Sequence, residues 1–291
     1  GARLSDQRAR ADTFAAGEFL MASLIMILSA ALIILMVKFG LLRGIDGIAN
    51  AMKWTAKTRG QVTGYATSVP EFVCLVASGL AGVWEAGLWN IASSNIINAF
   101  LMTGAVLYYR QSSELRNRRF VDEVGFALAA IAVPIALMTA ELDTDWRVIP
   151  ILLGFFAIYR FTDKRVNARA VSEAPASETV GNLRTGLILV VTALAVIGVL
   201  GVFLGNATAN VVEQLGIHPA LAGWILGLVT SIPEMVSFFS VYSSSKKAGR
   251  LQSLEDTQEA LDNLTGSNMA NVGIVYPIGL LAYLLVRGTI G

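Results

Sequence analysis

Long apolar stretches separated by short charged segments dominate this sequence. Runs that lack Asp, Glu, Lys and Arg, or that contain a single Glu, cover residues 19–37, 60–84, 86–109, 124–140, 148–159, 185–212, 214–245 and 263–286. A helix needs about 20 apolar residues to cross the hydrocarbon core of a bilayer. The fifth run is shorter, but Trp146 and Arg160 at its ends can reach the interfaces by snorkelling. The pattern predicts an all-α integral membrane protein with about eight transmembrane helices.

Composition supports a lipid bilayer as the partner and excludes several functions. Only 15% of the residues are charged, against roughly 25% in soluble domains. The net charge of +1 gives no reason to expect nucleic-acid binding. The single cysteine (Cys74) and single histidine (His218) exclude an internal disulfide and a multi-histidine zinc site. No nucleophile–base set or cofactor motif is present, so we expect neither an enzyme nor a covalently bound cofactor.

The distribution of Lys and Arg predicts an orientation. Most of these residues fall in the loops after the first, third, fifth and seventh runs, whereas the loops after the second, fourth and sixth hold only Arg147. The positive-inside rule then places the basic loops in the cytoplasm and both termini outside. The polar segment 162–184 is predicted to be a cytoplasmic linker between an N-terminal half (1–161) and a C-terminal half (185–291).

An internal repeat is the most informative feature. Residues 64–71 and 227–234 share the pattern G-x-x-T-S-[VI]-P-E. Asn90 and Ser94 follow the first copy, and Asn263 and Ser267, with the same four-residue spacing between them, follow the second after about ten extra residues. The copies span about 60–109 (runs two and three) and about 219–286 (runs seven and eight). They start five runs apart, so they cross the membrane in opposite directions, as inverted repeats of secondary transporters do.

The repeat places a carboxylate near the middle of each span. A central charge costs roughly 2.5–3.5 kcal/mol on insertion scales, so Glu71 and Glu234 are candidate functional residues. Pro70 and Pro233 are expected to leave the carbonyls of Ala66 and Val229 without helical donors. Carboxylates, carbonyls and hydroxyls together suit a hard cation such as Ca²⁺, and the same carboxylates can hold Na⁺ or protons. The candidate ligands are Glu71, Glu234, Asn90, Asn263, Thr67, Ser68, Thr230, Ser231, Ser94 and Ser267. Four further asparagines, Asn95, Asn98, Asn268 and Asn271, either pack helices or bind ions.

These motifs resemble the two alpha-repeats of the sodium/calcium exchanger (cation/Ca²⁺ antiporter) superfamily. The resemblance rests on Thr67–Glu71 and Thr230–Glu234, and on Asn90, Ser94, Asn263 and Ser267 in the paired helices. It implies that the two glutamates are central cation ligands, surrounded by the other eight candidates. Trp89, Ser93 and Asp262 stand where the family pattern has glycine.

The resemblance implies secondary antiport, with Ca²⁺ exported in exchange for Na⁺ or H⁺. Two other functions stay open: a cation channel on the same scaffold, and a non-transporting membrane subunit. Family members usually have ten spans, and a partner subunit, a homodimer or a divergent subfamily would account for the two spans that this sequence lacks. The sequence does not distinguish Ca²⁺ from Mn²⁺ or Mg²⁺, because all three prefer oxygen ligands.

Overall fold

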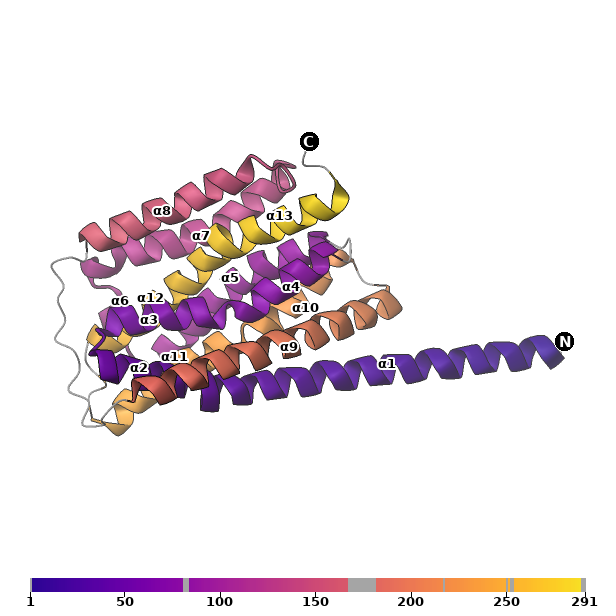
Figure 1. Cartoon of the computed structure of the whole chain (residues 1–291), viewed down its shortest axis with the longest axis horizontal. Helices are drawn as coiled ribbons and strands as arrows, with labels where there is room; N and C mark the ends of the chain where they lie inside the picture. The colour runs from indigo at the N-terminus through magenta and orange to yellow at the C-terminus, as the bar shows by residue number, and fades with distance from the viewer. Residues whose placement is uncertain are drawn as a thin grey trace.

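The fold consists of helices that run side by side along one axis (Figure 1). A computed structural model describes residues 2–80, 84–166, 182–216, 218–249, 251 and 254–288, and this part of the chain contains no strand. The prediction of an all-α membrane protein is confirmed.

The first two helical segments are interrupted. Helix α1 (Ala2–Met36) passes through a π-helical turn, η1 (Val37–Leu41), into α2 (Leu42–Met52). The next segment consists of α3 (Ala56–Thr67) and α4 (Val69–Leu80), which meet at Ser68. The proline in the second position of α4 has no N–H to continue the hydrogen-bond ladder, and this explains the break.

Three longer helices complete the first half. They are α5 (Trp84–Tyr108), α7 (Val121–Thr139) and α8 (Val148–Val166), and the short α6 (Ser112–Leu115) and η2 (Arg118–Phe120) connect α5 to α7.

The second half repeats the broken-helix design. Helix α9 (Leu183–Leu215) leads to α10 (Pro219–Thr230) and α11 (Ile232–Lys247), which meet at Ser231. The last segment consists of α12 (Leu254–Ala270), a π-helical turn η4 (Asn271–Val275) and α13 (Tyr276–Arg287).

The two repeats interlock. Helix α3 of the first repeat packs along α12 of the second, and α10 of the second packs along α5 of the first. Glycines at matching positions allow this approach. A Cβ atom on Gly64 would lie 2.7 Å from the Ser267 backbone nitrogen, and one on Gly227 would lie 2.9 Å from the Ser94 backbone nitrogen. Small residues at such crossings let membrane helices come into backbone contact.

The outer surface is apolar, as a lipid-facing surface requires. On α1, for example, the side chains of Leu20, Ile27 and Leu28 are about 60% exposed, whereas polar side chains fill the space between α3, α5, α10 and α12. Six helical runs in the described residues are long and apolar enough to span a membrane: 17–52, 84–108, 118–139, 183–215, 219–247 and 254–287. The chain is therefore a multi-pass integral membrane protein.

The number of eight spans stays a prediction. The pair α3 and α4 consists of two helices of 12 residues each, which individually are too short for a span. Helix α8 has the length of a span but carries four charged residues in its last two turns: Arg160, Asp163, Lys164 and Arg165.

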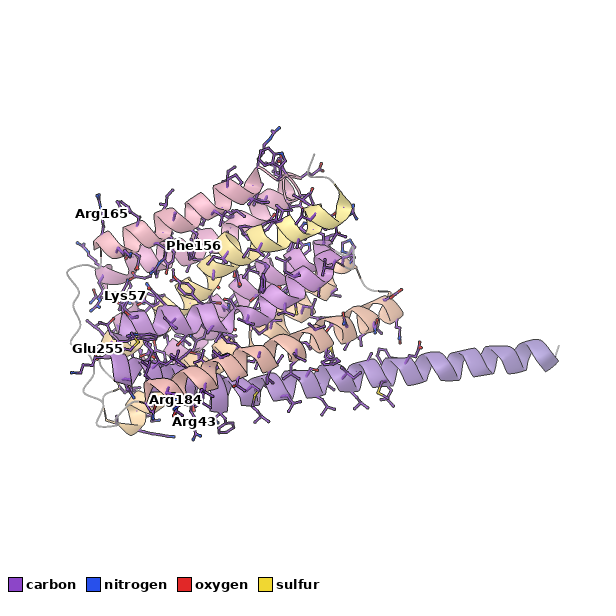
Figure 2. All side chains as sticks on the ribbon, in the orientation of Figure 1. Arg43, Lys57, Phe156, Arg165, Arg184 and Glu255 are labelled. Carbon is purple, nitrogen blue, oxygen red and sulfur yellow. The ribbon has the colours of Figure 1, made fainter. Side chains whose placement is uncertain are left out.

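Charged side chains gather at one end of the molecule (Figure 2). We call this end, where α2 meets α3, α8 ends and α9 begins, the linker end. Arg43, Lys57, Arg165, Arg184 and Glu255 all lie there. The assignment of this end to the cytoplasm, and of both termini to the outside, stays a prediction. The same holds for the division into halves, because residues 167–181 of the proposed linker lie outside the described residues.

Candidate functional site

Two buried glutamates occupy equivalent positions just beyond the two helix breaks. Glu71 lies in the first turn of α4 and Glu234 in the first turn of α11, and neither is exposed. The positive end of each helix dipole therefore faces its own carboxylate. The two carboxylates are close enough for their charges to interact.

The carboxylate of Glu71 belongs to a hydrogen-bonded set that includes both repeats. Ser94 on α5 donates its hydroxyl to Glu71 Oε1 at 2.8 Å. The Ser94 hydroxyl is also 3.0 Å from the hydroxyl of Ser231, the residue at the break of the second repeat. The serine of one repeat thus connects its own glutamate to the break of the other.

The carboxylate of Glu234 has the mirror arrangement. Ser267 on α12 donates to Glu234 Oε1 at 2.9 Å. Its hydroxyl is 2.9 Å from that of Ser68, the residue at the break of the first repeat. The two sets have the same chemistry and run in opposite directions, as an inverted repeat requires.

The two threonines have different partners. Thr230 donates to Oδ1 of Asn90, a residue of the other repeat, at 3.1 Å, whereas Thr67 donates to the Gly64 carbonyl of its own helix at 3.2 Å.

All ten candidate ligands from the sequence are buried, with at most 2% of any of them exposed. Eight of them contact another candidate ligand in the bonds above, and Asn263 donates instead to Ser237 Oγ at 2.7 Å.

Several buried polar atoms of the site lack a hydrogen-bond partner among the described residues. They are Glu71 Oε2, Glu234 Oε2, Asn263 Oδ1 and Asn90 Nδ2. A buried acceptor without a donor costs about 1–3 kcal/mol, so such atoms usually have a functional reason. Three of the four are oxygens, the atom type that hard cations bind.

The carbonyls of Ala66 and Val229 lack their usual helical donors, but other N–H groups lie against them. The Ser68 N–H points back to Ala66, and the Ser231 N–H points to both Gly227 and Val229. The prolines remove the usual donors, but the tight turn at each break brings in another.

The four additional asparagines pack helices. Asn98 donates to Asn268 Oδ1 at 3.3 Å, and Asn268 donates to the Asn95 carbonyl at 3.0 Å. Asn271 donates to Asn95 Oδ1 at 2.9 Å, and Asn95 donates to the carbonyl of Ala130 on α7 at 2.9 Å. These bonds fix α5 against α12, which carry the two serine donors of the site.

Ser237 is a residue of the site that the sequence interpretation missed. It lies three residues after Glu234 on α11, so the two side chains share a helix face. The position equivalent to Ser237 in the first repeat is Cys74. A search for polar residues one turn beyond each glutamate would have found Ser237.

Comparisons with known proteins agree with this geometry. A family model described as sodium/calcium exchanger protein matches residues 22–162 and 185–289. A structure of the sodium-calcium exchanger NCX_Mj soaked with Na⁺ and Sr²⁺ has 19% identity and a TM-score of 0.52, and the match covers 92% of this chain and 82% of that one. Another, soaked with Na⁺ and no Ca²⁺, has 17% identity and a TM-score of 0.55, with 91% and 83% covered.

At these identities the structural likeness shows the fold alone. Among curated proteins, none matches the chain. The family model, however, spans most of the chain, including both inverted repeats and all ten candidate ligands. The chain belongs to the sodium/calcium exchanger protein family.

Proposed function

We propose that this protein is a secondary active antiporter that exports Ca²⁺ in exchange for Na⁺ or H⁺, with Glu71 and Glu234 as the central ligands. The observation that carries the proposal is the matched pair of buried carboxylates at the breaks of two inverted repeats. Each carboxylate accepts a hydrogen bond from a serine of the paired helix. Family membership supports cation antiport in general, and the geometry supports this site for it.

The charge of the pair explains how one site can serve two cargoes. Two ionised carboxylates in a low-dielectric interior need about two positive charges for balance. One Ca²⁺ supplies both, and so do two Na⁺ ions or two protons. Because the same oxygens hold either cargo, binding of one excludes the other, and this competition is the basis of exchange.

The surrounding hydroxyls and amides complete the coordination. Ca²⁺ takes six to eight oxygen ligands at about 2.3–2.6 Å. The carboxylates alone supply four oxygens, so hydroxyl and amide oxygens are needed for a full shell. The proposed additional ligands are Asn90, Asn263, Thr67, Ser68, Thr230, Ser231, Ser94 and Ser267.

The interlocked repeats suit alternating access. The site lies between two inverted copies of the same helix arrangement, and rocking of one repeat against the other exposes such a site to each side in turn. The contacts of α3 with α12 and of α10 with α5 would then open at different times.

Radioactive Ca²⁺ uptake into proteoliposomes tests the proposal. Uptake is measured with an outward Na⁺ gradient, an outward H⁺ gradient or no gradient. We expect uptake to require one of the two gradients and to be lost in Glu71→Gln and Glu234→Gln, since either change leaves one negative charge. Glu85→Gln is the matched control, because Glu85 is exposed at the start of α5 and should not affect uptake.

Two results would contradict antiport. Uptake that is equal with and without gradients would indicate a channel. No uptake under any condition, with Ca²⁺ binding absent in the parent protein, would favour a non-transporting subunit. Competition by unlabelled Mn²⁺ and Mg²⁺ identifies the preferred divalent cation.

A further inference from the structure

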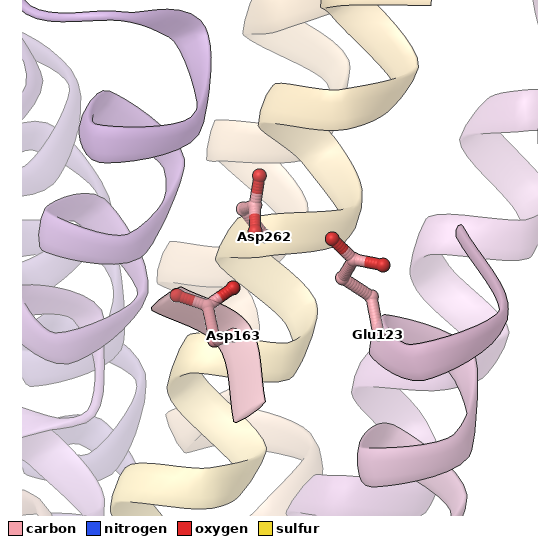
Figure 3. A group of neighbouring side chains, drawn as sticks. All are labelled: Glu123, Asp163 and Asp262. Atoms are coloured by element: carbon pink, nitrogen blue, oxygen red, sulfur yellow. The ribbon is translucent and has the colours of Figure 1, made fainter. Parts of the chain in front are cut away.

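A second buried charge cluster lies outside the candidate cation site. Lys57, in the first turn of α3, forms ion pairs with Glu123 on α7, Asp163 on α8 and Asp262 on α12. Its ammonium nitrogen is 3.4 Å from Glu123 Oε1 and 3.6 Å from Asp262 Oδ1. Figure 3 shows the three carboxylates turned toward one another from three different helices.

The cluster is built into the helix packing. At most 6% of any of the three carboxylate side chains is exposed, and 19% of Lys57. Gln258 donates to Asp262 Oδ2 at 2.5 Å and to Glu123 Oε1 at 3.3 Å. The carboxylate oxygens lie within 4.8 Å of one another, a spacing that a metal ion could bridge. The Lys57 ammonium, however, already lies among these oxygens, so the cluster is an ion-pair centre with a tethered cation.

More contacts attach the same end of α3 to its neighbours. Gln61, one turn beyond Lys57, donates to Asp163 Oδ2 at 2.9 Å. Arg160 on α8 donates to Gln61 Oε1 at 2.7 Å and to the Tyr65 hydroxyl at 3.0 Å. The start of α3 is therefore held to α7, α8 and α12 by charged and polar groups rather than by apolar packing.

The position of the cluster places it between the linker end and the cation site. At 1.5 Å per residue, Lys57 is about 16 Å along α3 from Ser68, and Asp262 is about 8 Å along α12 from Ser267. The two serines belong to the Glu234 set of the cation site. The contact of α3 with α12 therefore lies between the linker end and that set.

The equivalent contact at the opposite end has different chemistry. Glu71 and Glu234 are 163 positions apart, and the residue 163 positions after Lys57 is Ala220. Asn90 and Asn263 are 173 positions apart, and the residue 173 positions before Asp262 is Trp89. The two repeats thus have matching residues at the cation site but different residues at the positions of Lys57 and Asp262.

We infer that Lys57 and the three carboxylates form a latch that closes the linker end. The ammonium holds α3 to α7, α8 and α12, and these ion pairs must separate before the cation site can open toward that end. This inference rests on the proposed alternating access of the site. Lys57 would then help to determine toward which side of the membrane the cation site opens in the resting protein.

Hydrogen–deuterium exchange of the full chain in nanodiscs, without Ca²⁺ or a gradient, tests the latch. In Lys57→Gln we expect exchange over residues 56–66 and 254–263 to rise by roughly fivefold or more, since loss of the ion pairs lowers the local opening free energy. Because opening of one end closes the other, exchange over residues 84–92 and 219–230 should fall. Lys53→Gln, which changes an exposed lysine just before α3, should alter neither end.

Two further variants guard against misfolding. Lys57→Gln combined with Asp262→Asn removes one charge of each sign and leaves the net charge of the cluster unchanged. Asp163→Asn keeps Lys57 and two carboxylates, so a smaller change in the same direction is expected.

The latch would be overturned by unchanged exchange at the linker end in all three variants. A rise at the linker end without a fall at the other end would also overturn it, since the cluster would then be a local packing feature. The exchange pattern does not depend on transport, so a failed Ca²⁺ uptake assay and a failed latch are separate results.

Discussion

Replacing Gly64 with alanine tests whether the close approach of α3 and α12 sets the geometry of the cation site. A Cβ atom at this position would lie 2.7 Å from the Ser267 backbone nitrogen, whereas ordinary contacts begin at 3.4 Å. Both helices meet through their backbones here, so no side chain can rotate out of the way. The Asn263 backbone oxygen would lie closer still, so the helices must move apart by at least roughly 0.7 Å, the difference between these distances.

The expected cost follows from two opposing terms. Overpacking of a tight interface costs about 1–3 kcal/mol. The change from glycine to alanine inside a helix returns about 0.5–1 kcal/mol. Gly104→Ala on α5 is the matched control, because a Cβ atom there would meet nothing within 4 Å and only the favourable term applies. The two variants should therefore differ by about 1–3 kcal/mol in unfolding free energy.

Two quantities are measured for each variant in the same detergent: the apparent unfolding temperature and the affinity for Ca²⁺. We expect Gly64→Ala to unfold at a lower temperature than the parent, and Gly104→Ala at the same or a higher temperature. Separation of the helices also stretches the 2.9 Å contact between the Ser68 and Ser267 hydroxyls. Loss of one such hydrogen bond, worth about 1 kcal/mol, should weaken Ca²⁺ binding about fivefold. Equal unfolding temperatures for the two variants would refute the proposed role of the glycine crossing.

Further predictions concern the polar groups around the site. Ser237→Ala removes the acceptor of the Asn263 amide. We expect the free energy of unfolding to fall by about 1–3 kcal/mol, and the apparent unfolding temperature to fall with it. Cys74→Ser places a hydroxyl at the equivalent position of the first repeat, where the Asn90 amide nitrogen has no partner among the described residues, and should raise the unfolding temperature. Asn271→Ala breaks a 2.9 Å bond between η4 and α5, so it should lower stability by about 1 kcal/mol while the ratio of Ca²⁺ to Mn²⁺ affinity stays unchanged.

Much of the fold could be predicted from the sequence because a bilayer imposes strong constraints. The apolar runs located the long helices, and the repeat predicted that the two halves are inverted. The sequence could not show that α3 and α4 are separate 12-residue helices, because the apolar pattern continues through Ser68. The break results from the proline and the local turn, which a count of apolar residues does not detect.

The sequence could identify the polar residues around the two helix breaks, but not how they pair. Both glutamates stood out because carboxylates in apolar spans are costly. That Ser94 contacts Ser231, and Ser267 contacts Ser68, depends on which helices of the two repeats meet. These contacts join residues far apart in sequence, and they follow from the glycine crossings rather than from any local pattern.

Departures from the repeat carry as much information as its matches. In the sequence, Asp262 comes directly before Asn263 of the second copy, and Trp89 has the equivalent position before Asn90 of the first. In the structure, Asp262 is fully buried and paired with Lys57, whose own counterpart is Ala220. An exchanger with two identical repeats would have two ends of equal stability, and so no preferred resting side. If the site alternates as proposed, the charged contact at the linker end breaks that equality, because its ion pairs must separate before that end opens. The residues that differ between the copies are therefore the ones that can set the direction in which the resting protein faces.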